Sequence, residues 1–197
     1  IYLRMNICVF CASSDLLAPV FYEQARLLGE EIARHSCEVV YGGTNCGLMR
    51  EVAQAALRAG GKVKGIIPAC IQEKGITATG LTELVITSDM KERKQKMRET
   101  ADAFLAMPGG WGTLEEITEV ITLKQLGIHN KPVIFLNIEG FYDSFFSFIQ
   151  ESTRGGFIAP VYEKLYKIAR TVPEVFPYLK EEKDLCIDSK SVSYTHL

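Results

Sequence analysis

Two carboxylates follow a glycine-rich stretch in the middle of the chain. The segment MPGGWGT at 107–113 leads directly into Leu114, Glu115 and Glu116. Glycines let the backbone approach a ligand closely, and a helix that follows them offers free N–H groups at the positive end of its dipole. That arrangement suits a phosphate. The stretch therefore predicts a phosphate-binding turn with two acidic side chains beside it.

A purely structural interpretation of the same residues is also available. Thr113 and Glu116 have the spacing of a capping box, with Thr113 at the N-cap and Glu116 three residues later. This explains the threonine and the glutamate without any catalysis, but it does not explain three glycines and Trp111. No neighbouring residues would bury Trp111 in a core, so it is expected to cover a planar base or to lie in an oligomer interface. Both interpretations of Glu116 stay open at this point.

A second charged cluster lies at 88–102, SDMKERKQKMRETAD. Asp89 can cap a helix here, and the two methionines and Ala101 form an apolar stripe along it. Lys94 occupies a position on that stripe, with Arg93 beside it. Both side chains can pack their stems on the core and keep their charges in water. Alternatively, they turn towards an anionic ligand.

Short apolar runs rich in β-branched residues alternate along the chain with longer runs of helical period. The expected strands cover 6–11, 37–41, 62–67, 83–87, 102–107, 132–137 and 166–171. The expected helices cover 19–35, 46–59, 89–100, 113–126, 140–154 and 172–182. This alternation predicts an α/β fold: a Rossmann-like, doubly wound, mainly parallel sheet with helices on both faces. We expect a single domain of this fold over 1–187 and a flexible tail over 188–197.

Three of the expected strand ends have small, glycine- or serine-rich sequences. They are CASSD at 11–15, YGGTNCGLM at 41–49 and MPGGWGT at 107–113. In a doubly wound sheet, ligands bind outside the carboxyl ends of the strands. None of the three is a Walker A motif, and GGTNCG does not match G-x-G-x-x-G. Tight packing explains any one of them, but three at one sheet edge favour a ligand site.

Composition and charge exclude several other classes of protein. The chain has 197 residues, is 47% hydrophobic and 23% charged, and carries a net charge of −2, so neither nucleic acid nor a membrane surface is an expected partner. No apolar stretch approaches the roughly 18–20 residues that span a bilayer, and we expect a cytoplasmic protein. Cys8 and Cys11 have redox or metal spacing, but they fall in an apparent buried strand. Reduced core thiols are the favoured interpretation, and no metal is expected.

The charged cluster and the glycine-rich stretch together resemble a known family signature. The pair Arg93-Lys94 followed by PGGWGTLEE at 108–116 is similar to the motif of the LONELY GUY (LOG) family. Its members are cytokinin riboside 5′-monophosphate phosphoribohydrolases, often labelled possible lysine decarboxylases. The similarity extends over 8–14, 41–49 and 121–137. The resemblance implies hydrolysis of the N-glycosidic bond of a purine nucleoside 5′-monophosphate, either a cytokinin riboside monophosphate or AMP, without a cofactor, in a homodimer or larger homo-oligomer.

Matching the motif residue by residue implies a set of site residues. Arg93 and Glu116 correspond to the catalytic pair of the family. The substrate-contacting positions correspond to Lys94, Gly110, Trp111, Gly112, Thr113, Leu114 and Thr122. The rest of the expected substrate site is Gly109 together with the loops that carry Ser13, Ser14, Gly42 and Gly43. The helix at 113–126, with the segment 123–129, is the expected interface between subunits.

The implied chemistry fits these residue types. Breaking the bond leaves an oxocarbenium-like ribose, which the Glu116 carboxylate can stabilise while it orients the attacking water. Arg93 would align the substrate and Glu116, or ease departure of the base. The dipole of the helix is expected to keep Glu116 ionised.

Three alternative functions would each require different residues. A non-catalytic nucleotide- or cofactor-binding protein would use the same glycine loops without needing Glu116 or Arg93. A pyridoxal-phosphate lysine decarboxylase needs a Schiff-base lysine, and no lysine here has such a setting. A redox protein built on Cys8 and Cys11 would need reactive thiols. The pairing of Arg93 with Glu116 at family spacing favours the hydrolase.

Overall fold

The strands form one parallel sheet, as predicted. The computed structural model describes residues 4–184, so the expected tail at 188–197 lies outside the described residues. Within that range the sheet has seven strands in the order β4-β3-β2-β1-β5-β6-β7, and every pair is parallel. The strands are β1 (Asn6–Phe10), β2 (Glu38–Tyr41), β3 (Lys62–Pro68), β4 (Glu83–Thr87), β5 (Ala103–Ala106), β6 (Val133–Leu136) and β7 (Lys167–Ala169).

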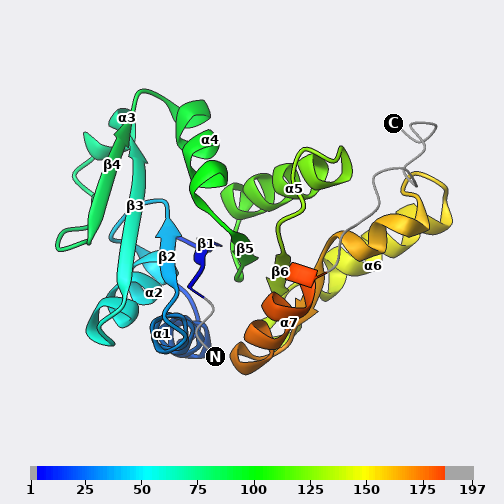
Figure 1. Ribbon diagram of the computed structural model, residues 1–197, viewed down its shortest axis with the longest axis horizontal. Helices are drawn as coiled ribbons and strands as arrows, with labels where there is room; N and C mark the ends of the chain where they lie inside the picture. Colours follow the sequence, from blue (N-terminus) through cyan, green and yellow to red (C-terminus); the bar gives the residue numbers. More distant parts are fainter. Residues whose placement is uncertain (1–3, 185–197) are drawn as a thin grey trace.

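Helices cover both faces of this sheet (Figure 1). On one face lie α1 (Pro19–Arg34), α2 (Gly47–Arg58) and α7 (Val172–Asp184), and on the other lie α4 (Met90–Thr100), α5 (Trp111–Gln125) and α6 (Asp143–Arg154). All six correspond to expected helices. The sequence did not predict the four-residue α3 (Ala69–Gln72) or the 3₁₀ turns η1 (Ile138–Gly140) and η2 (Pro160–Leu165). Among the described residues, no helix combines the length and apolarity needed to cross a bilayer.

The inner strands β1, β2, β3, β5 and β6 contribute side chains to two separate cores, one on each face of the sheet. In β1, Ile7 and Val9 belong to the core under α1, α2 and α7, whereas Cys8 and Phe10 belong to the core under α4, α5 and α6. Cys11 lies on the first of these sides, so the two cysteines face opposite sides of the sheet. Burial raises the pKa of both thiols. They are free, buried core thiols, as expected.

The strand order reverses beside β1. The chain moves outward from β1 through β2 and β3 to the edge strand β4, and then returns to pair β5 with the other side of β1. The return segment contains α4, which lies across β3, β4, β1 and β2 on its way back. Such a reversal opens a crevice at the carboxyl ends of the two diverging strands, where doubly wound proteins bind ligands. In this chain the crevice lies between the ends of β1 and β5.

Candidate active site

The three glycine- and serine-rich junctions meet at the strand-order reversal. The backbone N–H of Ala12, after β1, donates to the carbonyl of Pro108, after β5, over 3.1 Å. The N–H of Leu48, after β2, donates to the carbonyl of Ala12 over 2.9 Å. Gly47 has a φ of +51°, and a Cβ there would lie 2.5 Å from the Ser14 carbonyl oxygen. Only glycine permits this close approach of two loops.

A pocket of about 160 Å³ opens where these loops meet. Its lining consists of Val9, Phe10, Cys11, Ser13, Gly42, Met49, Met90, Arg93, Met97, Gly112, Thr113, Glu115 and Glu116. Six of these residues were predicted site residues: Ser13, Gly42, Arg93, Gly112, Thr113 and Glu116. The methionines were not predicted as site residues, because methionine spacing along a helix is equally typical of a core.

Arg93 and Glu116 form an ion pair in this pocket. The Nη1 of Arg93 donates to the Oε1 of Glu116 over 2.8 Å, and the two side chains are only 10% and 12% exposed. Arg93 is oriented further by its Nε, which donates to the carbonyl of Ile66 over 3.1 Å. A Cβ on Gly42 would lie 2.2 Å from the Nη2 of Arg93. The guanidinium therefore occupies the space that any larger side chain at Gly42 would fill.

The expected capping box at the start of α5 is wrong. The helix begins at Trp111 with the extended residue Gly110 as its N-cap, so Thr113 lies within the first turn. Thr113 instead packs on Gly109, where a Cβ would lie 2.1 Å from its Oγ1. Glycine is an acceptable N-cap, and the helix can therefore start earlier than the tryptophan and glycine suggested. Glu116 is placed in the second turn, where its carboxylate reaches Arg93 rather than the backbone.

The helix dipole does not bring the pKa of Glu116 below the usual glutamate value. Burial raises the pKa of Glu116 above the usual glutamate value, and the charge and hydrogen bond of Arg93 only partly oppose this. The loss of solvation on burial raises this pKa more than the contacts with Arg93 and Lys94 lower it. A carboxylate in this state is a better proton acceptor than an exposed one.

Lys94 lies outside the pocket lining. Its ammonium forms ion pairs with Glu115 and, at 3.3 Å, with Glu119 of α5. These contacts, above all the hydrogen bond that Lys94 donates to Glu115, raise the pKa of Lys94. Arg98 also contacts Glu119, at 3.1 Å. These ion pairs could not be predicted from the sequence, because a glutamate on a helix surface is usually solvated.

The other predicted site residues do not line this pocket. They are Ser14, Gly43, Gly109, Gly110, Trp111, Leu114 and Thr122, in addition to Lys94. Trp111 is 88% exposed at the start of α5. Thr122 lies far along the same helix, where its hydroxyl donates to the Thr118 carbonyl over 2.8 Å. No group of three or more histidine, cysteine or acidic side chains among residues 4–184 is arranged to hold a metal ion.

Comparison with known proteins connects these features to characterised relatives. Residues 49–179 match the family described as possible lysine decarboxylase. The chain is 43% identical to cytokinin riboside 5′-monophosphate phosphoribohydrolase LOG7 of Arabidopsis thaliana, over 89% of this chain and 81% of that protein. It is 42% identical to the probable cytokinin riboside 5′-monophosphate phosphoribohydrolase LOGL9 of Oryza sativa subsp. japonica, over 89% of this chain and 78% of the relative.

Solved structures show the same fold at lower identity. The molybdenum cofactor binding protein of Rippkaea orientalis superposes with a TM-score of 0.70 at 21% identity, over 90% of this chain and 96% of that one. The Moco carrier protein of Chlamydomonas reinhardtii gives a TM-score of 0.69 at 21% identity, over 91% and 98% of the two chains. At this identity the likeness concerns the fold alone. The sequence matches go further, and by them the chain belongs to the LOG family of cytokinin riboside 5′-monophosphate phosphoribohydrolases.

Proposed function

We propose that this protein hydrolyses the N-glycosidic bond of purine nucleoside 5′-monophosphates, releasing the free base and ribose 5-phosphate. The substrates proposed are N6-substituted cytokinin riboside monophosphates, AMP, or both. The names of the relatives support this, and the observation that carries it is the buried ion pair of Arg93 with Glu116 in a pocket beside a glycine-rich helix start. We also propose a single catalytic domain located in the cytoplasm, where the free thiols would stay reduced.

The start of α5 would hold the 5′-phosphate. The first N–H groups of a helix have no partner within it, and they lie at the positive end of its dipole. A Cβ on Gly110 or Gly112 would meet no atom within 4 Å, so the space beside this backbone is open. Gly112 and Thr113 also line the pocket that contains Glu116. A phosphate bound here would place the attached ribose towards the carboxylate.

Glu116 and Arg93 would then act on the sugar and on water. Water adds to C1′ as the bond from C1′ to the base nitrogen breaks, and the water proton is finally transferred to the departing base. The Glu116 carboxylate would accept that proton and stabilise the positive charge that develops on the ribose. Arg93 would hold the carboxylate in place and keep it ionised against the effect of burial.

Base release is the experiment that tests this function. The protein is incubated with AMP, isopentenyladenosine monophosphate, CMP and adenosine, and free base is followed by chromatography. Glu116→Gln and Arg93→Ala are measured alongside. We expect release from the purine monophosphates only, and loss of release in both variants. The ratio of the two purine rates then identifies the preferred substrate.

A non-catalytic binding protein would give a different result. Trp111 is the only tryptophan in the chain and lies at the proposed phosphate site, so its fluorescence reports nucleotide binding independently of hydrolysis. Binding of AMP without any release of base would refute the hydrolase and favour a nucleotide- or cofactor-binding protein.

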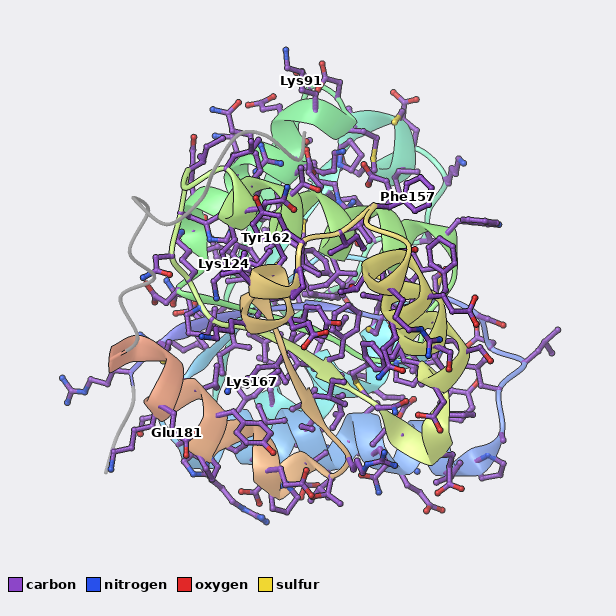
Figure 2. The ribbon with its side chains drawn as sticks, turned by 90° about the vertical axis from the view of Figure 1, so that its right-hand side faces the viewer. Lys91, Lys124, Phe157, Tyr162, Lys167 and Glu181 are labelled. Atoms are coloured by element: carbon purple, nitrogen blue, oxygen red, sulfur yellow. The ribbon has the colours of Figure 1, made fainter. Side chains whose placement is uncertain are left out.

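We also propose that the chain forms a homodimer, or a larger homo-oligomer, through the end of α5. Leu126, Ile128 and Val161 are exposed apolar residues at the end of α5, just after it and in η2, and α5 contacts η2. Figure 2 labels Lys124 of α5 and Tyr162 of η2, which belong to these two elements. Light scattering should give a dimer or larger mass for the native chain, and Ile128→Asp should lower it. A monomeric native chain would refute the assembly.

A further inference from the structure

Glu119 connects two basic side chains of the neighbouring helix. Its carboxylate lies 3.3 Å from the Nζ of Lys94 and 3.1 Å from the Nη1 of Arg98. The three side chains are about one fifth to one third exposed, and Lys94 also contacts Glu115. The result is a continuous row of charges between α4 and α5. An isolated exposed pair contributes little, but several linked charges constrain geometry more strongly.

This row lies directly beside the proposed catalytic pair. Arg93 and Lys94 are consecutive on α4, and Glu115 and Glu116 are consecutive on α5. One small cavity between the helices is lined by Phe10, Lys94, Met97, Arg98, Glu116, Glu119 and Val120. Glu119 and Glu116 therefore line the same cavity. A shift of the side chains that contact Glu119 would also displace the Glu116 carboxylate.

Apolar packing alone fixes α4 weakly. Within this helix the only buried residues are Arg93 and Met97. The facing helix α5 buries Ile117 and Val120 in the same core as Met97. A single buried methionine does little to define how α4 is rotated about its own axis, because methionine adapts readily to its surroundings. The hydrogen bond from Arg93 to the Ile66 carbonyl orients the guanidinium itself, and the charged contacts of Lys94 and Arg98 add a constraint on the rotation of α4.

We propose that Glu119 is a positioning residue for the phosphoribohydrolase site: by holding Lys94 and Arg98 it fixes α4 against α5 and aligns Arg93 with Glu116. The inference rests on the proposed function, because it concerns the same reaction. Glu119 itself does not line the substrate pocket. Its effect is carried by the two basic residues of α4.

The proposal has an electrostatic consequence at Glu116. This carboxylate is faced by Arg93 and Lys94 from α4, by Glu115 on its own helix, and by two cysteines, Cys8 of β1 and Cys11 just after it. The two basic groups lower the pKa of Glu116, and Glu115 raises it. Loss of Glu119 would release α4 and weaken the contact of Arg93. The pKa of Glu116 would then rise. As the pH is lowered, activity would therefore be lost at a higher pH than in the wild type.

The test compares Glu119→Gln with Glu119→Asp and with Glu99→Gln. The first removes the charge, and the second keeps the charge on a shorter side chain. The third is the matched control, because Glu99 accepts a hydrogen bond from Gln95 within α4 and its removal costs the same single charge. Release of base from AMP is measured against pH, and unfolding temperatures are measured for every variant.

For Glu119→Gln we expect kcat to fall by about 10- to 100-fold, the size of effect that misplaced reacting groups produce. The acidic limb of the profile should move to higher pH, KM should change less than kcat, and Glu119→Asp should recover part of the rate. Glu99→Gln should match the wild type. A purely structural role would lower the unfolding temperature while leaving the pH profile and kcat unchanged, and that result would overturn the proposal. An inactive wild type would instead refute the proposed function, and this inference with it.

Discussion

A single added methyl group at Gly42 should uncouple Arg93 from Glu116. The Cβ of an alanine there would lie 2.2 Å from the Nη2 of Arg93 and 2.6 Å from the terminal methyl of Met49. Both neighbours are the far ends of flexible side chains, and the φ of Gly42 lies outside the left-handed region. The backbone can therefore accept alanine at this position. The guanidinium and the methionine must move, and the guanidinium is the group that holds the carboxylate.

The size of the effect follows from the contact that is lost. The displaced interaction is a charge-assisted hydrogen bond of 2.8 Å between side chains that are 10% and 12% exposed. Hydrogen bonds to charged groups contribute about 1.5–3 kcal/mol. If Gly42→Ala costs this amount in the transition state, the rate should fall by about 10- to 150-fold, at about 1.4 kcal/mol for each factor of ten. Overpacking should lower the free energy of unfolding by about 1–3 kcal/mol.

Base release from AMP and thermal unfolding measure the two effects separately. Gly155→Ala is the control, because it adds the same methyl group after α6, where the nearest atoms belong to the exposed ring of Phe157. We expect this control to keep the wild-type rate. A Gly42→Ala variant with the wild-type rate would show that the contact between Arg93 and Glu116 does not contribute to catalysis.

Two further changes test the surroundings of the pair. Because burial raises the pKa of Glu116 and the carboxylate must be ionised, kcat/KM should decline as the pH falls through a value above the usual glutamate pKa of about 4.3. Arg93→Met should move that decline to still higher pH, and an unchanged profile would contradict the assignment. Tyr142→Phe removes a 2.6 Å hydrogen bond to the carbonyl of Met107, just before the glycine loop, so KM for AMP should rise while the unchanged buried ring keeps the chain folded. An unchanged KM would mean that this bond does not position the loop.

Local patterns were sufficient to predict the sheet and the edge where the site lies. Continuous apolar runs identified the strands because both faces of a parallel sheet are buried. The small residues at three strand ends identified the loops that line the pocket. The start of α5 was predicted two residues too late, because Trp111 and Gly112 are poor helix formers. Tertiary contacts place them in the first turn regardless.

Contacts between distant segments account for what the sequence did not predict. The partners of Lys94 are Glu115 and Glu119, 21 and 25 residues further along the chain, and helical spacing carries no information about such pairs. The burial of Glu116 likewise depends on how α4 crosses the sheet. That the pKa of Glu116 is raised could therefore be inferred only from the structure.

The reversal of strand order has a consequence for how activity is acquired during folding. Arg93 follows the edge strand β4, whereas Glu116 follows β5, which pairs with β1 on the opposite side. Neither the segment that ends at β4 nor the segment that begins at β5 contains both groups. Only 23 residues separate them, but the strand between them, β5, takes its place in the sheet by pairing with β1 across almost one hundred intervening residues, as Ala103 does with Ile7. Such non-local pairing forms slowly. Catalytic competence should therefore appear late in refolding and all at once, and a fragment lacking either half of the sheet should have none.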